Sequence, residues 1–410
     1  MEGTMFKRLL ALPKTVWFIG LISLVNDTAS ELLYPLIPIY LTSVLMVGPR
    51  ILGLIEGIAE ATASIFKLIS GVVVDKTKNT KIWIVVGYFL AGFGRPFIAF
   101  VSSWGWILVI RFTDRMGKGL RSSPRDALLA QTVAPSERGI TFGLHRSLDN
   151  AGAVIGPIIA SVLLANHVPL KDIFLWALLP AAIVMVLTCF INEPKVVITP
   201  ENDHFHWSLK GMPKKFKFYL LAMAILTLGN SSDMFLLLRL SDLGVSPIEI
   251  PLIWAGVSLI TSLCGTPLSA LSDRYGREPF ILGAWLAFVL FYFGLSFSSL
   301  SLYQVIGLFA LYGFFKAATE GVEKALVADL APLGLVGTAF GWFNLIAGVM
   351  ILPSSIIFGW LYESYGTQYA FLYSAGCASV ALGIFLITVF PFRPNVINGD
   401  ESQKGLNSIT

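Results

Sequence analysis

Long apolar runs constrain this chain more than any other feature of its sequence. A helix needs about twenty predominantly apolar residues to cross the hydrocarbon core of a bilayer, and such runs follow one another along the chain. Hydrophobic residues make up 55% of the 410 residues and charged residues only 13%, whereas soluble domains carry about 25% charged residues. The chain has too few polar residues to cover a soluble fold, so we predict an all-α polytopic membrane protein.

Twelve membrane-spanning helices fit the hydropathy pattern. The predicted spans cover residues 15–42, 51–74, 82–102, 105–132, 140–165, 173–192, 218–241, 250–271, 279–298, 301–328, 335–361 and 368–391. The longest polar segment separates two groups of six spans. The predicted domains are an N-terminal six-helix bundle over 1–192, a cytoplasmic linker over 193–217, a C-terminal six-helix bundle over 218–392 and a cytoplasmic tail over 393–410.

The basic residues between the spans predict the orientation. Lys and Arg concentrate in cytoplasmic loops, and an even number of spans places both termini on the same side. That side holds the lysines of the linker, whereas the opposite loops hold little more than Arg50 and Lys171. We therefore expect cytoplasmic N- and C-termini in a multi-pass protein of the inner (plasma) membrane.

An internal repeat appears at one fixed offset. Asp75 and Asp273 are 198 residues apart, as are Lys118 and Lys316. Matching charged residues are rare in a sequence this apolar, so the register is informative. Because the offset spans six helices, an even number, the two copies have the same orientation. This predicts two parallel pseudo-repeats related by an axis along the membrane normal.

Several classes of protein are disfavoured. The net charge of +4 does not suggest a nucleic-acid partner. Cys189, Cys264 and Cys377 lie far apart in apolar runs, which argues against a disulfide framework and a zinc site. We find no nucleophile–base spacing, phosphate-binding loop or set of metal ligands. We expect neither an enzyme nor a protein with a cofactor or metal.

Two loops carry related motifs. Residues Gly71–Lys78 read G-V-V-V-D-K-T-K, and Ser269–Arg277 read S-A-L-S-D-R-Y-G-R. Both are similar to the loop signature G-x-L-x-D-R-x-G-R-K of the major facilitator superfamily, although the first copy has Lys76 where Arg is expected. Together with twelve spans in two halves, the chain resembles this superfamily over its whole length. The resemblance implies a central cavity lined by the first, fourth, seventh and tenth spans.

Two further motifs are narrower. The first span ends in Y-P-L-I-P-I-Y with Pro35 and Pro38, and the fifth contains G-A-V-I-G-P from Gly152 to Pro157. Both resemble signatures of twelve-span drug/proton antiporters, a resemblance that implies export. An alternative interpretation of Gly152 and Gly156 is structural, because small residues one turn apart let a neighbouring helix approach closely.

Charged residues gather in the spans that the resemblance places around the cavity. A charge inside a bilayer costs about 3 kcal/mol or more, so these residues are candidates for function. Asp27 and Glu31 stand one helical turn apart in the first span, and two nearby carboxylates repel each other. We interpret them as a proton-coupling pair; the alternative is a structural ion pair with an Arg of the fourth or fifth span.

The most charged span has three interpretations. Residues 111–126 contain five cations and two carboxylates, which fall within an arc of about 140° on a helix. They could bind an anionic substrate, form structural salt bridges or serve a gate near the cytoplasmic end. Arg111, Arg115 and Lys118 lie deeper and are the better candidates for the substrate site, whereas the later cations suit a gate.

The candidate substrate ligands are polar or charged residues of the cavity-lining spans and of the fifth span: Asn26, Ser30, Tyr34, Arg111, Arg115, Lys118, Arg146, Asp149, Asn230, Asp233, Lys316 and Glu320. The candidate gate residues lie near the predicted cytoplasmic ends: Asp75, Arg121, Arg125, Asp273 and Arg274.

The sequence favours a proton-coupled secondary transporter that works by alternating access, as a monomer. The antiporter-like motifs favour export of a small organic solute, and the excess of cations favours an anion or zwitterion such as a metabolite, a siderophore-like compound or a drug. One alternative is uptake or exchange of an organic anion coupled to protons or sodium. Another is a membrane sensor that has lost transport.

Overall fold

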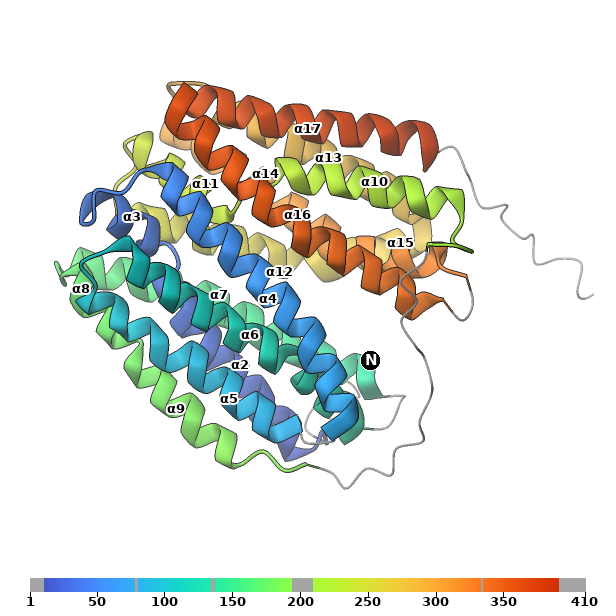
Figure 1. The fold of residues 1–410 in the computed structure, drawn as a ribbon, viewed down its shortest axis with the longest axis horizontal. Coiled ribbons are helices and arrows are strands. Elements are labelled where there is room, and N and C mark those ends of the chain that lie inside the picture. Colours follow the sequence, from blue (N-terminus) through green and yellow to red (C-terminus); the bar gives the residue numbers. More distant parts are fainter. Residues whose placement is uncertain (1–10, 78–79, 134–136, 194–208, 333–334, 391–410) are drawn as a thin grey trace, which may run out of the picture.

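The chain folds into helices. The computed structural model describes residues 11–77, 80–133, 137–193, 209–332 and 335–390, and these contain no strand. The helices run nearly side by side in two groups, which meet at the end where α3 and α11 lie and diverge toward the other (Figure 1).

The first group holds the helices that precede the polar linker segment: α2 (Lys14–Leu33), α3 (Leu36–Ser43), α4 (Pro49–Thr77), α5 (Thr80–Gly94), the 3-10 helix η1 (Arg95–Phe100), α6 (Trp104–Thr132), α7 (Arg138–Ala165), α8 (Leu170–Trp176) and α9 (Leu178–Cys189). The second group holds those that follow it: α10 (Lys214–Gly229), α11 (Asp233–Asp242), α12 (Glu249–Tyr275), α13 (Arg277–Leu295), α14 (Leu302–Glu320), α15 (Val322–Leu330), α16 (Val336–Tyr365) and α17 (Thr367–Thr388).

Each of the twelve predicted spans coincides with one of these helices or with two consecutive ones. In the described part of the chain, ten helical segments are long and apolar enough to cross a membrane. The remaining two long helices, α4 and α6, have 29 residues each. They are long enough to cross, but they carry too many charged residues to qualify by apolarity.

Some of the predicted spans are broken in the middle, which the hydropathy pattern does not reveal. The first breaks between α2 and α3, where Pro35 follows Tyr34, because proline has no N–H for the helical ladder. The seventh breaks between α10 and α11. There the hydroxyl of Ser232 accepts a hydrogen bond from the Met234 N–H at 3.3 Å and begins a new helix, as N-cap serines do.

Close helix packing in the first group confirms the structural interpretation of the glycine pair in α7. A Cβ on Gly152 would lie 2.5 Å from the carbonyl oxygen of Leu24, and a Cβ on Gly156 would lie 2.5 Å from that of Thr28. Both carbonyls belong to α2. The two glycines therefore let the backbones of α2 and α7 approach to a distance that a side chain would prevent.

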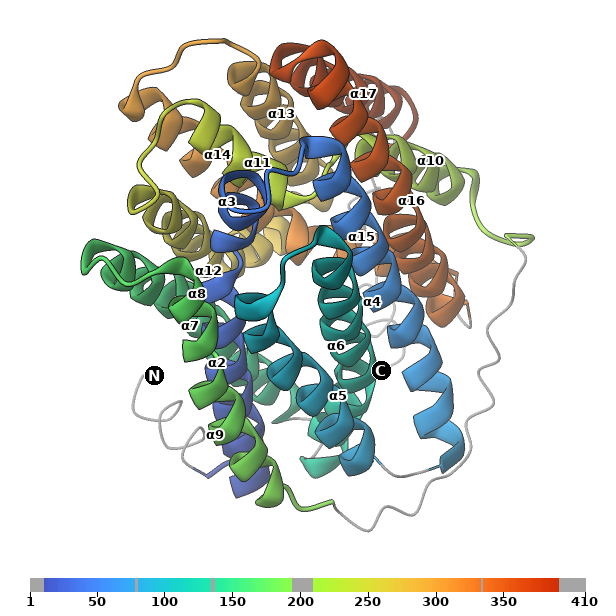
Figure 2. The same ribbon diagram turned by 60° about the vertical axis from the view of Figure 1, so that its left-hand side comes forward.

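The two groups touch along α4 and α16 and along α7 and α12 (Figures 1 and 2). Polar contacts lie at the end where the groups meet. The hydroxyl of Ser161 donates to the carbonyl oxygen of Ile248 at 2.8 Å, and the Arg50 N–H donates to Glu363 at 2.9 Å. The halves are therefore joined at one end and separate at the other.

A buried ion cluster explains how α4 and α6 accommodate their charges. The guanidinium of Arg111 holds both carboxylate oxygens of Glu56 at 2.7 Å and Asp114 at 3.4 Å. Asp114 also pairs with Arg95 at 2.8 Å. All four residues are buried, so each charge is compensated inside the protein. The polar face of α6 is turned into the first bundle.

Substitution of Gly152 by alanine should weaken the contact between α2 and α7. We expect Gly152→Ala to lose about 1–3 kcal/mol through overpacking and to lower the thermal unfolding midpoint of the purified protein by several degrees. Gly143→Ala is the matched control, because Gly143 lies in the same helix and a Cβ there meets nothing within 4 Å. Equal midpoints for the two variants would contradict the close approach.

Removal of one partner of the buried ion cluster should be strongly destabilising. Glu56→Ala leaves Arg111 buried without its main partner, which costs about 3–5 kcal/mol. We expect the double variant Glu56→Ala/Arg111→Met to recover part of this loss, and Asp172→Ala, at an exposed position, to change the unfolding midpoint little. A midpoint for Glu56→Ala equal to that of Asp172→Ala would show that the charges are not buried as described.

Candidate functional site

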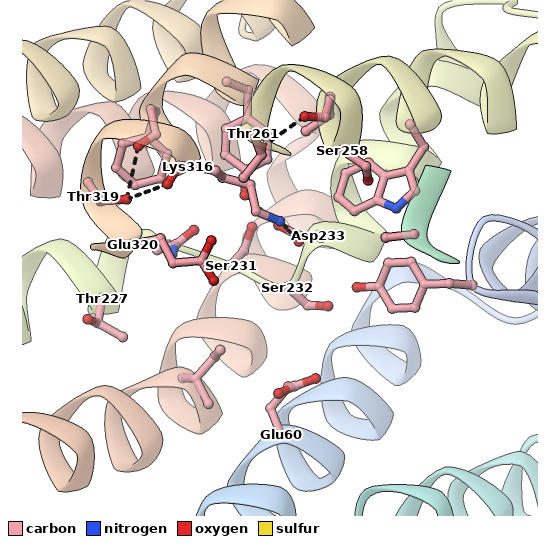
Figure 3. A pocket seen from close by; sticks show the side chains of 18 of the residues that line it. Glu60, Thr227, Ser231, Ser232, Asp233, Ser258, Thr261, Lys316, Thr319 and Glu320 are labelled. Carbon is pink, nitrogen blue, oxygen red and sulfur yellow. Dashed lines mark hydrogen bonds and ion pairs between the residues drawn. The ribbon is translucent and has the colours of Figure 1, made fainter. Parts of the chain in front are cut away.

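A cavity of about 560 Å³ lies between the two groups of helices (Figure 3). Its polar lining comes from both groups: Glu31, Tyr34, Glu60, Arg115, Lys118, Arg146, Asn150, Thr227, Asn230, Ser231, Ser232, Asp233, Trp254, Ser258, Thr261, Tyr312, Lys316, Thr319, Glu320 and Glu323. Helices α2, α6, α10, α11, α14 and α15 belong to the first, fourth, seventh and tenth predicted spans. Helices α4, α7, α12 and α16 also contribute lining residues.

The wall from the first group is charged. Arg115 of α6 forms an ion pair with Glu60 of α4 at 3.1 Å. Lys118, one turn further along α6, is exposed to the cavity. Its ammonium makes no ion pair with a carboxylate of the described residues. This wall therefore offers one uncompensated positive charge to a ligand.

The wall from the second group centres on Asp233, the first residue of α11. Its carboxylate accepts a hydrogen bond from the Tyr312 hydroxyl at 2.5 Å. It also forms an ion pair with Lys316 at 3.1 Å (Figure 3). The Lys316 ammonium also lies 5.1 Å from the Trp254 ring centroid and 5.7 Å from that of Tyr312. Aromatic faces attract a cation at such distances. Lys316 is thus held by a carboxylate and two rings.

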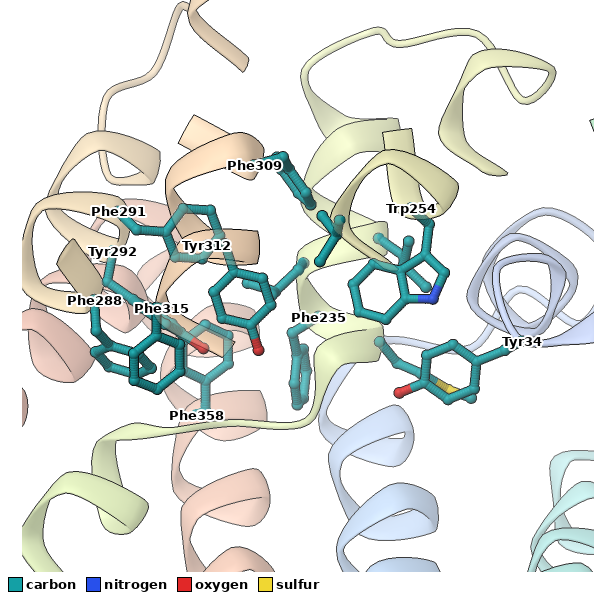
Figure 4. Packing of buried hydrophobic residues seen from close by; sticks show 14 of the residues in the cluster. Tyr34, Phe235, Trp254, Phe288, Phe291, Tyr292, Phe309, Tyr312, Phe315 and Phe358 are labelled. Atoms are coloured by element: carbon teal, nitrogen blue, oxygen red, sulfur yellow. The ribbon is translucent and has the colours of Figure 1, made fainter. Parts of the chain in front are cut away.

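Aromatic packing behind this wall fixes its position (Figure 4). Tyr312 stacks on Phe291 with centroids 4.6 Å apart, and Phe315 packs on Phe288 at 4.7 Å. Aromatic pairs in this range contribute about 0.5–1.5 kcal/mol beyond the area that they bury. Because these rings come from α13 and α14, they hold α14 in the rotation that points Lys316 into the cavity.

Two contacts cross the cavity from one group to the other. The indole N–H of Trp254 donates to Glu31 at 3.1 Å, which links α12 to α2. Arg146 of α7 forms an ion pair with Glu320 of α14. Side chains of the two halves therefore contact each other directly across the cavity. A change of charge on Glu31, Arg146 or Glu320 would alter these contacts between the halves.

The structure separates the two carboxylates of the predicted proton-coupling pair. Glu31 lines the cavity and contacts Trp254. Asp27 instead faces α7, since a Cβ on Gly152 of that helix would lie 3.1 Å from the Asp27 Cβ, and it lies within electrostatic range of Asp149. The two carboxylates of the first span thus have different neighbours, and their action as a proton-coupling pair stays a prediction.

Other candidate ligands also lie outside the cavity lining. Asn26 donates to Asp27 at 2.8 Å and faces Arg95, Ser30 lines a much smaller space beside Arg95, and Arg111 belongs to the buried ion cluster. The cavity does contain the following candidates from the sequence: Glu31, Tyr34, Arg115, Lys118, Arg146, Asn230, Asp233, Lys316 and Glu320.

The candidate gate residues of α6 have well-defined surroundings. The Arg121 guanidinium is buried and lies 4.5 Å from the Tyr88 ring centroid. Arg125 pairs with Asp126 at 3.1 Å and donates to Ser23 at 3.4 Å. Both therefore contact groups of their own bundle.

The loop-motif candidates lie near the ends of helices. Asp273 forms an ion pair with Arg277, which also contacts Asp329 at 3.3 Å. Arg274 lies over the ring of Tyr275. Asp75 lies in α4, and its side chain is outside the described residues.

The candidates from the sequence omit several lining residues. Glu60 shares a helical face with Glu56 and Lys67, a pattern visible in the sequence. Trp254 and Tyr312 carry no such signal, because aromatic residues are common throughout the apolar runs. Their position emerges only when α12 and α14 are packed.

The comparisons with known proteins agree with this architecture. The family model of the Major Facilitator Superfamily matches residues 19–240 and 218–408. An uncharacterised MFS-type transporter of Methanocaldococcus jannaschii is 30% identical over 387 residues, covering 92% of this chain and 95% of the relative. The multidrug resistance protein MdtH of Klebsiella pneumoniae is 24% identical, covering 81% and 82%.

Solved structures show the same fold. A mutant of the nucleoside transporter NupG aligns with a TM-score of 0.78 at 14% identity, covering 91% of this chain and 99% of that one. At this identity the likeness concerns the fold alone. The match of the family model over nearly the whole chain, the relatives and the cavity between two helical bundles together show that the chain is a membrane transporter of the Major Facilitator Superfamily.

Proposed function

We propose that the protein is a proton-coupled secondary transporter that moves a small organic anion or zwitterion by alternating access. The observation that carries the proposal is the cavity between the halves, whose walls hold titratable groups from both. The two halves would rock around this site. Because the cavity lies between the halves of one chain, we propose that a monomer is sufficient.

The proposed topology has twelve spans, with both termini in the cytoplasm and the protein in the inner membrane. Helices α4 and α6 have 29 residues each, and their buried charges are paired with neighbours in the same bundle. This pairing lowers the free energy cost of placing the charged residues of α4 and α6 in the membrane interior. We therefore propose that both helices cross the membrane together with the ten apolar segments. The Lys and Arg residues between the spans support the orientation. With this orientation the cavity opens to the cytoplasm.

The proposed proton site is the pair Asp27 and Asp149. Asp27 faces α7, the helix that carries Asp149, and the two carboxyls lie within electrostatic range of each other. Ser23 donates to Asp149 at 3.0 Å. Loss of the shared proton would place two negative charges between α2 and α7 and change the preferred packing of these helices. A coupling ion must favour one state over the other in this way.

The uncompensated ammonium of Lys118 supports an anionic group on the substrate. The other lining cations are already paired, Arg115 with Glu60 and Lys316 with Asp233. The carboxylates of those pairs could also receive a cationic group, which suits a zwitterion. The antiporter-like motifs favour export, as does similarity to proteins named for multidrug resistance.

Substitution of Asp27 should separate coupling from substrate movement. A screen of organic anions, zwitterions and lipophilic cations for thermal stabilisation first identifies a ligand. In proteoliposomes, we expect Asp27→Asn to abolish transport driven by a proton gradient and to retain exchange of labelled for unlabelled ligand. Asp172→Asn, at an exposed position, is the control. Gradient-driven transport at wild-type rate in Asp27→Asn would refute this proton site, and accumulation on the side away from the acid would contradict antiport and favour uptake.

Neutralisation of Lys118 should weaken binding of the anionic group. We expect Lys118→Gln to raise the Kd of an anionic or zwitterionic ligand about tenfold, which corresponds to about 1.4 kcal/mol. Lys171→Gln is the matched control, because Lys171 is exposed and lies outside the cavity lining. Binding can be measured by calorimetry on purified protein. An unchanged Kd in Lys118→Gln, or a ligand set made up of lipophilic cations, would contradict the proposal that Lys118 binds an anionic group of the substrate.

A further inference from the structure

A buried histidine is joined to the proposed proton site by hydrogen bonds. His145 of α7 is 5% exposed, and its ring Nε2 lies 2.9 Å from the hydroxyl oxygen of Ser23 in α2, which is also buried. The Ser23 hydroxyl donates to the carboxylate of Asp149 at 3.0 Å. His145, Ser23 and Asp149 therefore form a continuous chain of hydrogen bonds between α2 and α7.

The single hydrogen of the Ser23 hydroxyl fixes the direction of this chain. A serine hydroxyl donates one hydrogen bond and accepts two. Because Ser23 donates to the ionised Asp149, the bond to His145 must be donated by the ring, so we assign a hydrogen to Nε2. When Asp149 instead carries a proton, its carboxyl donates to Ser23 and Ser23 donates to Nε2. The same three groups can therefore hold a proton at either end.

The charged groups around the chain come from four helices: Asp27 of α2, Arg125 and Asp126 of α6, Arg146 of α7, and Glu320 of α14, which pairs with Arg146. Arg125 donates to Ser23 at 3.4 Å and pairs with Asp126 at 3.1 Å. Among the described residues, no charged side chain of α8 or α12, which also pack on α7, forms an ion pair with this set. The Asp126 side chain is 45% exposed, so the set extends from the buried histidine to the protein surface.

His145 lies between Asp149 and the end at which the two halves separate. The hydrogen bond of Ser161 joins α7 to the other half at the end where the groups meet, so α7 begins with Arg138 at the opposite end (Figure 1). His145 follows Arg138 by about two turns and precedes Asp149 by about one. A proton that enters from the separated end therefore reaches the histidine before the carboxyl.

We propose that His145 and Ser23 relay protons between the separated end of the protein and the carboxyl of Asp149. The inference rests on the proposed function, because it supplies the path by which the pair Asp27 and Asp149 gains and loses its proton. In the loading step the imidazolium of His145 gives its Nε2 proton to the Ser23 oxygen, while the hydroxyl hydrogen of Ser23 passes to Oδ1 of Asp149. The products are a neutral ring with its hydrogen on Nδ1, an intact serine and a protonated carboxyl. Release is the reverse, and the ring exchanges its second hydrogen with water at the separated end.

The rate at which Asp149 takes up a proton tests the relay without knowledge of the substrate. The full-length protein is placed in phosphatidylcholine nanodiscs, protons are released by photolysis of a caged-proton compound, and time-resolved infrared spectroscopy follows the carboxyl band of Asp149. Asp149→Asn identifies that band by its loss. We expect His145→Gln to slow the rise of the band about tenfold or more and to retain its final amplitude. The Gln side chain keeps an N–H that donates to Ser23, but it cannot pass on a proton.

Two further variants complete the comparison. Ser23→Ala interrupts the chain at its centre and should slow the band as His145→Gln does. His167→Gln is the matched control, because His167 is exposed just beyond the end of α7, and it should leave the rate unchanged.

Two results would overturn the proposal. A wild-type rate in His145→Gln would show that the histidine makes only a structural hydrogen bond, which Gln preserves. Absence of an Asp149 band in the wild-type protein would leave the chain without a proton acceptor. Because the measurement follows proton binding and not transport, the relay and the proton site can fail separately. Loss of gradient-driven transport in Asp27→Asn together with an unchanged band in His145→Gln rejects the relay and keeps the proton site, and the opposite pair of results rejects the coupling role of Asp27 and keeps the relay.

Discussion

Pairing of charges inside the first bundle is the constraint on which the rest of the structure depends. Helices α4 and α6 carry charges that a lipid-facing helix could not tolerate. The contacts of Arg111 with Glu56 and of Asp114 with Arg95 of η1 compensate three of them within one buried cluster. Arg115 and Lys118, further along α6, line the cavity instead. The same helix thus supplies both the structural ion pairs and part of the site.

The two bundles are stabilised by different interactions, although the sequence predicts that an internal repeat relates them. In the second bundle the rings of Phe288, Phe291 and Tyr312 pack behind the cavity wall, and α14 presents Lys316 from an apolar background. In the first bundle, ionic contacts have that role. Each half therefore uses its own interactions. The two walls of the cavity are therefore supported by different kinds of contact.

The positions of the helices could be predicted from the sequence because hydropathy reports burial in lipid directly. The partners of charged residues could not. Asp27 and Glu31 were expected to act together because they are one turn apart, but two other helices supply their neighbours: Asp149 of α7 lies near Asp27, and Trp254 of α12 donates to Glu31. Arg111 was predicted to be a substrate ligand because the sequence does not reveal its partner Glu56, which is 55 residues away. The packing of α4 on α6 brings the two residues together. The partner of a charged residue is therefore determined by how the helices pack and not by spacing in the sequence.

The polar contacts between the halves bear on the alternating access proposed above. At the closed end they are individual hydrogen bonds, such as Ser161 to Ile248 and Arg50 to Glu363. Each contributes only about 1 kcal/mol because water can replace it. Glycines such as Gly53 and Gly57 let α4 lie directly on α16, a surface along which helices can slide without unlocking large side chains. One proton moving across about 100 mV supplies roughly 2.3 kcal/mol. Within the described residues no deeply buried ion pair joins the halves, because the buried charges are paired inside the first bundle. Under the proposed proton coupling, a driving force of that size would therefore not have to break a buried ion pair between the halves.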